Sequence, residues 1–283
     1  MPKRAKVGKG HSSSILYDLF GDFSLYSRVM EREGKRLARK YPDKNLSRLF
    51  NEMPHRMITV LPMALFHSMS KDLGNTVSKE AICAIGLCSF PIGTHDDIVD
   101  ETPDRQQEIA ALVYAGNIAA SEGLMMLMRK GKVETAEALV ESINRNHFRQ
   151  QRVVDLLWSG RKPTEAVYLD GIRHIVEFIS IGPLCAIAEA EEKGLRRRIM
   201  DFSEGYGPVI QLIDDIREVD EDRRTKYASL PLTEGKPFRS SFRLGFEGIA
   251  KARRSLKPEW NNMAYFVDRA EQFLMRLEAE LSG

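Results

Sequence analysis

The chain has 283 residues, of which 43% are hydrophobic and 29% are charged, and this composition is typical of a globular protein. Its formal net charge of +2 lacks the basic excess of nucleic-acid-binding proteins, which excludes nucleic acid as the main partner. Cys83, Cys88 and Cys185 show no CxxC spacing, and they predict free thiols in a reducing cytoplasm. No apolar run approaches the roughly 18 residues that cross a bilayer, so we expect no transmembrane segment.

Apolar residues recur at helical spacing along almost the whole chain. A basic N-terminal stretch, residues 1–13, is expected to be a flexible tail, and residues 14–283 are expected to form one domain. Gly182-Pro183 predicts a break inside a helix. No alternating strand pattern and no glycine-rich phosphate loop is present, so the predicted fold class is all-α, a single many-helix bundle. The expected helices cover residues 14–40, 45–71, 77–102, 107–129, 132–159, 164–191, 193–222, 238–255 and 258–281.

A first acidic cluster, Asp96, Asp97, Asp100 and Glu101, follows the apolar run from Ile82 to Ile92. Asp96 and Asp100 are four residues apart, which places their carboxylates on one helical face. Like charges repel there unless a cation lies between them, and Mg²⁺ prefers such oxygen ligands. The other interpretation is a solvated acidic helix end, which the apolar character of the preceding run disfavours.

A second acidic cluster begins at Asp214, 118 residues after Asp96, and again follows an apolar run. Asp214, Glu218 and Asp222 are each four residues apart and are predicted to share one face of the helix. Arg223, Arg224 and Lys226 follow directly. Cations beside metal-binding carboxylates are typical of a site for a polyanion.

These two clusters resemble the aspartate-rich motifs of the trans-isoprenyl diphosphate synthase family. The second cluster, with Gln211 three residues before Asp214, is similar to the family's FQxxDD region. The likeness covers roughly residues 45–235. It implies the class I isoprenoid synthase fold around a central apolar cavity, an Mg²⁺-dependent enzyme acting on an allylic prenyl diphosphate, and a homodimer.

The resemblance also implies roles for individual residues. Three Mg²⁺ ions would join Asp96, Asp100 and Asp214 to the substrate diphosphate, with Arg105 and Lys226 stabilising the leaving group. Phe90 would line the wall that limits the length of the prenyl chain. The predicted metal ligands are Asp96, Asp97, Asp100, Asp214, Glu218 and Asp222, and the predicted substrate-binding residues are Arg56, Phe90, Gln211, Arg105, Lys226 and Arg173.

The chain departs from the family at the site for a second diphosphate, that of isopentenyl diphosphate. Arg56 fits the family's pattern, but Met53 stands in place of a lysine and Ser89 in place of a histidine or glutamine. Gln106 replaces the second arginine after the first cluster. Because a diphosphate needs several charge-assisted hydrogen bonds, we expect cyclisation of the ionised substrate to a terpene. A helix break at Gly182-Pro183 would suit this reaction, and Arg173 would then contact the diphosphate.

Several alternatives stay open. If Lys35-Arg36 were the family's basic motif, the enzyme would elongate an allylic diphosphate with isopentenyl diphosphate. A prenyltransferase with a non-diphosphate acceptor would also dispense with the second diphosphate site. Outside enzymes, the candidates are a non-catalytic partner subunit and a helical metal-binding scaffold. Both acidic clusters persist, which disfavours the partner subunit, and the neighbouring Arg105 and Lys226 disfavour the scaffold.

Overall fold

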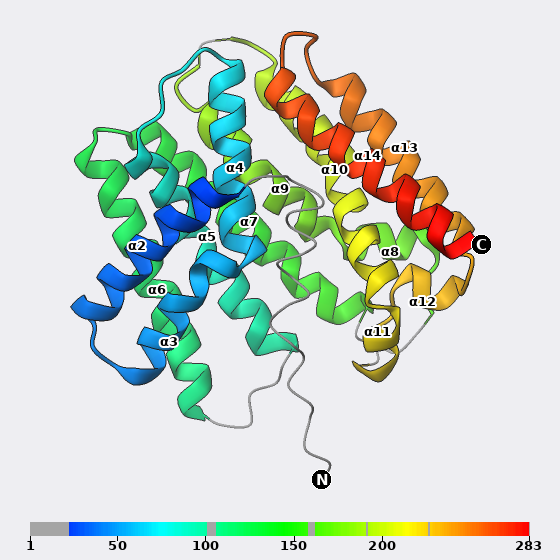
Figure 1. Cartoon of the computed structure of the whole chain (residues 1–283), viewed down its shortest axis with the longest axis horizontal. Helices are drawn as coiled ribbons and strands as arrows, with labels where there is room; N and C mark the ends of the chain where they lie inside the picture. The colour runs from blue at the N-terminus through cyan, green and yellow to red at the C-terminus, as the bar shows by residue number, and fades with distance from the viewer. Residues whose placement is uncertain (1–22, 101–105, 158–161, 191, 226, 283) are drawn as a thin grey trace.

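The computed structural model describes residues 23–100, 106–157, 162–190, 192–225 and 227–282. The tail predicted over residues 1–13 lies outside these ranges. All regular elements in the described ranges are helices (Figure 1), which confirms the all-α prediction. They are α2 (Ser24–Lys40), α3 (Lys44–Glu52), the 3₁₀ helix η1 (Met53–His55), α4 (Met57–Asp72), α5 (Lys79–Asp100), α6 (Gln106–Arg129), α7 (Val133–Leu157), α8 (Glu165–Gly171), α9 (Arg173–Ala186), α10 (Leu195–Arg217), α11 (Val219–Thr225), α12 (Leu230–Glu234), α13 (Arg239–Ser255) and α14 (Asn261–Ser282).

Polar side chains fix the starts of several of these helices. Asp43 accepts hydrogen bonds from the backbone N–H groups of Asn45 and Leu46 at the start of α3, and Thr164 accepts one from Val167 in α8. Such caps satisfy donors that have no partner within the helix. Asp72, the last residue of α4, does the same across the fold, because its carboxylate accepts from the backbone N–H groups of Asn262 and Met263 in α14.

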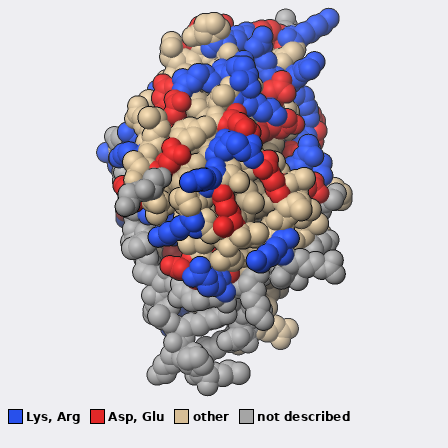
Figure 2. Space-filling view, turned by 90° about the vertical axis from the view of Figure 1, so that its right-hand side faces the viewer, with Lys and Arg blue, Asp and Glu red and all other residues tan. Residues whose placement is uncertain are grey.

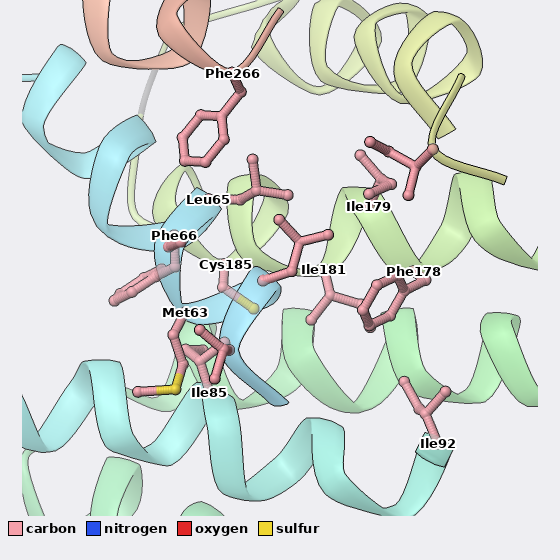
Figure 3. Close-up of a cluster of buried hydrophobic side chains, with 14 of the residues drawn as sticks. Met63, Leu65, Phe66, Ile85, Ile92, Phe178, Ile179, Ile181, Cys185 and Phe266 are labelled. Atoms are coloured by element: carbon pink, nitrogen blue, oxygen red, sulfur yellow. The ribbon is translucent and has the colours of Figure 1, made fainter. Parts of the chain in front are cut away.

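Four helices, α4, α5, α7 and α9, form a closed ring of neighbours. α4 packs on α5 and α9, and α7 packs on the same two helices. Apolar side chains from α4, α5 and α9 meet inside, and Phe266 of α14 reaches the same cluster (Figure 3). Their burial supplies the hydrophobic stabilisation of the fold. The labelled members of the cluster are Met63, Leu65, Phe66, Ile85, Ile92, Phe178, Ile179, Ile181, Cys185 and Phe266.

A pocket of about 390 Å³ lies at the edge of this cluster, between α2, α4 and the start of α14. Phe266 belongs to both the pocket wall and the central cluster. The pocket contains no residue of either acidic cluster, so it is separate from the candidate site. Its lining residues are Phe23, Tyr26, Ala64, Ser68, Asn261, Asn262, Tyr265 and Phe266.

The break predicted at Gly182-Pro183 is wrong, since α9 continues through both residues to Ala186. The glycine serves packing instead. A Cβ at position 182 would lie 2.3 Å from the carbonyl oxygen of Pro62 and 2.7 Å from the backbone nitrogen of Phe66. Only a residue without a Cβ lets α9 approach the backbone of α4 this closely.

Three of the predicted long helices are divided in the structure. The segment 45–71 contains α3, η1 and α4. The segment 164–191 contains α8 and α9, which are separated at Ile172. The segment 193–222 contains α10 and α11, because regular helix stops at Arg217 and resumes at Val219. The division between α10 and α11 falls inside the second acidic cluster, at Glu218.

Helix α6 is the one helix in the described ranges that is long and apolar enough to cross a membrane. This differs from the expectation that no segment would qualify. A third of its apolar window is buried inside the protein, and the core helix of a water-soluble protein passes the same test. Ile118, Leu124 and Met126 are half-buried against the core, and Tyr114, Met125 and Met128 are exposed.

Basic side chains of α13 pair with carboxylates on the same helix and on neighbouring helices. Arg243 binds Glu165 and Glu247, and Lys251 binds Glu204. Figure 2 shows this side of the molecule, on which acidic and basic side chains are interspersed. These pairs make α13 a solvated, charge-balanced face rather than a basic patch.

Candidate active site

The two acidic clusters lie toward the same end of the bundle. Helices α5 and α10 both run from the upper to the lower side of Figure 1, and each cluster is at the C-terminal end of its helix. The apolar halves of these helices are buried in the core. Each helix therefore leads from an apolar interior to a group of carboxylates at its end.

In the first cluster, two adjacent aspartates have different surroundings. Asp96 is partly exposed, and its Oδ1 accepts a hydrogen bond of 3.4 Å from Nε2 of Gln150 on α7. Asp97 forms an ion pair with Arg56, with 2.6 Å between its Oδ2 and Nη1 of the arginine. Asp97 is thus held by Arg56, the residue just before α4, and Asp96 accepts a hydrogen bond from an amide on α7. Among the other predicted residues, the side chain of Asp100 and the whole of Arg105 lie outside the described part of the chain.

Arg56 connects this cluster to the apolar interior. Its guanidinium carbon lies 5.7 Å from the ring centroid of Phe90, within range of a cation–π contact. Phe90 is fully buried on α5, nearly two turns before Asp96. Phe90 therefore lies in the apolar interior on the same helix as Asp96, and its role as a wall residue stays a prediction.

A histidine pair, which sequence reasoning missed, borders the first cluster. The rings of His95 on α5 and His147 on α7 have centroids 4.7 Å apart. Burial is the main cause that lowers the pKa of His147 to about 4, and the neighbouring His95 adds a smaller effect in the same direction. The ring is therefore neutral at physiological pH. His147 is one turn before Gln150. No short motif marks it in the sequence, because the pair forms only when α5 and α7 pack together.

In the second cluster, Asp215 is buried and Asp214 is partly exposed. Tyr168 on α8 donates a hydrogen bond of 2.5 Å to Oδ2 of Asp215, and Nε2 of Gln211 donates one of 2.7 Å to Oδ1. Burial is the main cause that raises the pKa of Asp215 well above its usual range, and the nearby Asp222 contributes less in the same direction. The two hydrogen bonds lower the pKa but do not offset these effects. Gln211, predicted to bind substrate, thus has an intramolecular partner.

The predicted ladder of carboxylates is not uniform. Glu218 lies at the division between α10 and α11 and is exposed, whereas Asp222 is buried and accepts a hydrogen bond from the hydroxyl of Ser229. The division at Glu218 takes the place of the single continuous face expected from the spacing. Lys226 lies outside the described residues.

The donor set suits a hard cation, because carboxylate oxygens are the ligands that Mg²⁺ prefers. Within the described residues, no three histidine, cysteine or acidic side chains are close enough together to hold a metal ion by themselves. Ligands from both helices and oxygens from a substrate would have to complete the coordination shell. This fits Mg²⁺, which commonly binds through one or two carboxylates together with substrate phosphates.

The positions expected to bind a second diphosphate offer little to an anion. Met53 and Ser89 are fully buried, and the hydroxyl of Ser89 donates to the backbone of Ile85. Arg56 is already paired with Asp97. Arg173, predicted to contact the diphosphate in the cyclase interpretation, is exposed at the start of α9.

Lys35 and Arg36, the alternative basic motif, belong to an ion network between α2 and α6. Lys35 binds Glu31, and Arg36 binds Glu33 and Glu122. Lys40 and Tyr41 also donate to Glu122. These side chains have carboxylate partners of their own away from the two acidic clusters, which disfavours the motif as a diphosphate site.

Glu122 makes the stability of the α2–α6 contact dependent on pH. Burial raises its pKa, but hydrogen bonds from Lys40, Arg36 and Tyr41 outweigh burial and lower it to about 2. Because the pKa of Glu122 is lower in the folded protein than in the unfolded chain, its ionised carboxylate stabilises the fold at pH values above about 4.5. This stabilisation is lost as the pH falls from about 4.5 toward 2. After discounting for solvent screening, we expect Glu122→Gln to lower the free energy of unfolding by about 1 kcal/mol at pH 7, and by less at pH 3. Urea unfolding at both pH values measures the difference, and an equal loss at both would contradict it.

Comparisons with known proteins agree on the fold. No protein-family model matches the chain, and no curated protein matches its sequence. The structure is similar to that of a decaprenyl diphosphate synthase from Rhodobacter capsulatus, with 13% identity, a TM-score of 0.64, and coverage of 95% of this chain and 99% of that one. A geranylgeranyl pyrophosphate synthase from Corynebacterium glutamicum, complexed with calcium and isoprenyl diphosphate, has 15% identity, a TM-score of 0.61 and coverage of 91% and 99%. A heptaprenyl diphosphate synthase from Staphylococcus aureus has 17% identity, a TM-score of 0.55 and coverage of 92% of both chains. The chain therefore has the all-helical fold of the isoprenoid diphosphate synthases.

Proposed function

We propose that this protein is an Mg²⁺-dependent enzyme that ionises an allylic prenyl diphosphate and transfers the prenyl group to an acceptor. The observation that carries the proposal is the position of the two acidic clusters, at the same end of two buried helices in a fold shared with polyprenyl diphosphate synthases. One of the similar structures binds calcium and isoprenyl diphosphate. Carboxylates at the same end of two helices suit the same pairing of cation and diphosphate.

Each part of the site has a chemical role in this proposal. Asp96, Asp100 and Asp214 would hold the Mg²⁺ ions, which neutralise the diphosphate as the C–O bond breaks and it leaves with the bonding electrons. Arg105 and Lys226 would bind the departing anion. Phe90 and the apolar cluster beyond it would exclude water from the allylic cation. Gln150 would orient Asp96, and Arg56 would keep Asp97 in place.

Transfer is favoured over cyclisation by two observations. The similar structures are named as prenyl and polyprenyl synthases. The helix break that would have suited cyclisation is absent, since α9 is continuous through Gly182 and Pro183.

Cyclisation to a terpene is the second candidate because the positions expected to bind isopentenyl diphosphate lack groups that bind an anion. Burial of Met53 and Ser89 leaves no side chain at those positions to bind a second diphosphate. Arg56, the one cation present, is already paired with Asp97. The same observation favours a non-diphosphate acceptor if the reaction is a transfer.

The test is to incubate the purified protein with Mg²⁺ and geranyl, farnesyl or geranylgeranyl diphosphate, each with and without isopentenyl diphosphate. Longer diphosphates formed only with isopentenyl diphosphate would establish elongation. A hydrocarbon or terpene alcohol formed without it would establish cyclisation and overturn transfer. Absence of any diphosphate release, in a protein that binds none of these substrates, would favour the non-catalytic partner subunit.

We also propose that the protein is a homodimer joined through α6 and α7, in the cytoplasm, where its three buried cysteines stay reduced. Large apolar side chains on these two helices are exposed to solvent, although α6 and α7 pack against each other. Large exposed apolar side chains on two helices that pack together suit an interface between subunits. The residues are Tyr114, Met125 and Met128 on α6 and Val133, Val140 and Phe148 on α7.

We therefore expect the double variant Met125→Glu/Phe148→Glu to sediment as a monomer, because burying either charge without a partner would cost several kcal/mol. Met275→Glu is the control, since Met275 is similarly exposed, but on α14, and its replacement should leave the dimer intact. Analytical ultracentrifugation at micromolar concentration gives the masses. A monomeric wild-type protein, or a dimer that survives both charges, would show that this face is not the interface.

A further inference from the structure

Each acidic cluster contains a pair of adjacent aspartates, and in both pairs the second aspartate is tied into the protein. Asp97 is bound by Arg56, and Asp215 is bound by Tyr168 and Gln211. The hydrogen bond between Tyr168 and Asp215 is more deeply buried than the ion pair between Arg56 and Asp97, because Tyr168 is fully buried and Asp215 nearly so. Because both oxygens of the buried Asp215 already accept hydrogen bonds, this carboxylate is poorly placed to bind a metal ion.

The tie on Asp215 lies close to the end of its helix. Regular helix in α10 stops at Arg217, two residues after Asp215, and α11 begins at Val219 after the single residue Glu218. The last turn of a helix has carbonyl groups without intrahelical partners and is the part that frays most readily. A hydrogen bond from a neighbouring element at this point restricts the turn that carries Asp214.

Tyr168 is itself held rigidly. It lies in α8, whose first turn is capped by Thr164, and its ring packs in a small apolar cluster with Ile172 of the loop after α8 and Leu212 of α10. The hydroxyl therefore has little freedom, and its 2.5 Å bond to Asp215 joins two packed elements at a fixed distance.

We propose that Tyr168 is a positioning residue for the second acidic cluster: through Asp215 it fixes the last turn of α10, and thereby the placement of Asp214 for binding Mg²⁺ with a diphosphate. The inference rests on the proposed function, since it assigns Asp214 to that site. Groups that orient metal ligands from behind typically change metal affinity by 10–100-fold when they are lost. We expect an effect of this size from removal of one hydroxyl group.

The experiment compares Tyr168→Phe with Tyr206→Phe. Tyr206 is an equally buried tyrosine on α10, and its hydroxyl bonds a backbone carbonyl, that of Phe266, at 3.4 Å. Both changes remove one buried hydroxyl group, but only the first removes a bond to the acidic cluster. Binding of inorganic diphosphate in the presence of increasing Mg²⁺ is followed by the rise in unfolding temperature, and needs no catalysis.

We expect Tyr168→Phe to raise the Mg²⁺ concentration for half-maximal stabilisation by about 10-fold, while Tyr206→Phe leaves it unchanged. Asp215→Asn, which keeps the shape of the side chain, should act in the same direction and provides the measurement if Tyr168→Phe does not fold. Should both variants at positions 168 and 215 lose stability but keep the wild-type Mg²⁺ dependence, the bond is only structural and the inference is overturned. If the wild-type protein itself is not stabilised by Mg²⁺ with diphosphate, the proposed function fails, and this inference with it.

Discussion

Replacing Asp96 or Asp214 by asparagine is expected to lower kcat/KM for diphosphate release by on the order of 10³-fold, comparable to the loss of a main electrostatic contact to a transition-state anion. Asparagine keeps the size of the side chain and one oxygen but removes the negative charge that holds Mg²⁺. Both residues are partly exposed at the ends of buried helices, so neither change should disturb the core. Release of diphosphate from an allylic substrate at saturating Mg²⁺ measures the effect.

The matched control is Asp220→Asn. Asp220 lies in the same acidic segment, but its side chain is 82% exposed and pairs with Arg223. Its replacement should change the rate by less than about twofold, since exposed pairs contribute little. If Asp96→Asn and Asp214→Asn retained the activity of this control, the two clusters would not be the catalytic site, whatever the fold.

Replacing Gly182 by alanine should destabilise the protein by about 3 kcal/mol, at the upper end of the cost of overpacking a core. The added Cβ would lie 2.3 Å from the carbonyl oxygen of Pro62. Because this neighbour is backbone rather than the end of a flexible side chain, α4 and α9 would have to move apart. These two helices form part of the ring around the apolar cluster, so the cost spreads through the core. The midpoint of urea unfolding reports the change.

Gly86 provides the comparison for this prediction. A Cβ at position 86 would also be too close to its neighbours, at 2.4 Å from the sulfur of Met63 and 2.9 Å from that of Met30. Methionine side chains adapt readily, so Gly86→Ala should cost less than about 1 kcal/mol. If Gly182→Ala and Gly86→Ala destabilised the protein equally, the close backbone contact at Gly182 would not explain the loss of stability.

The features of this fold that could be predicted from the sequence are those that depend on the spacing of apolar and acidic residues close together in the chain. Helical spacing of apolar residues gave the fold class. An apolar run followed by acidic residues located both clusters, and the structure places them at the C-terminal ends of α5 and α10. Phe90, expected on the inner wall, is fully buried on α5, and its role as a wall residue stays a prediction.

What could not be predicted depends on contacts between distant segments. Gly182-Pro183 has the local signature of a helix break, yet the glycine is needed because the backbone of α4, 120 residues earlier in the chain, lies so close to it. Tyr168 and Asp215 are 47 residues apart, and nothing near either residue shows that one binds the other. The exposed Glu218 and the buried Asp222 look equivalent by spacing, but the end of α10 at Arg217 separates their environments.

The link between Asp72 and the start of α14 has a consequence for how the protein is made. The two partners are 190 residues apart, so synthesis at about 5–20 residues per second leaves an interval of about 10–40 s between them. Throughout that interval α4 lacks its contact with α14, and the apolar cluster lacks Phe266. The nascent chain thus presents an unfinished apolar surface until its last helix emerges, and exposed surface of this kind favours aggregation during synthesis.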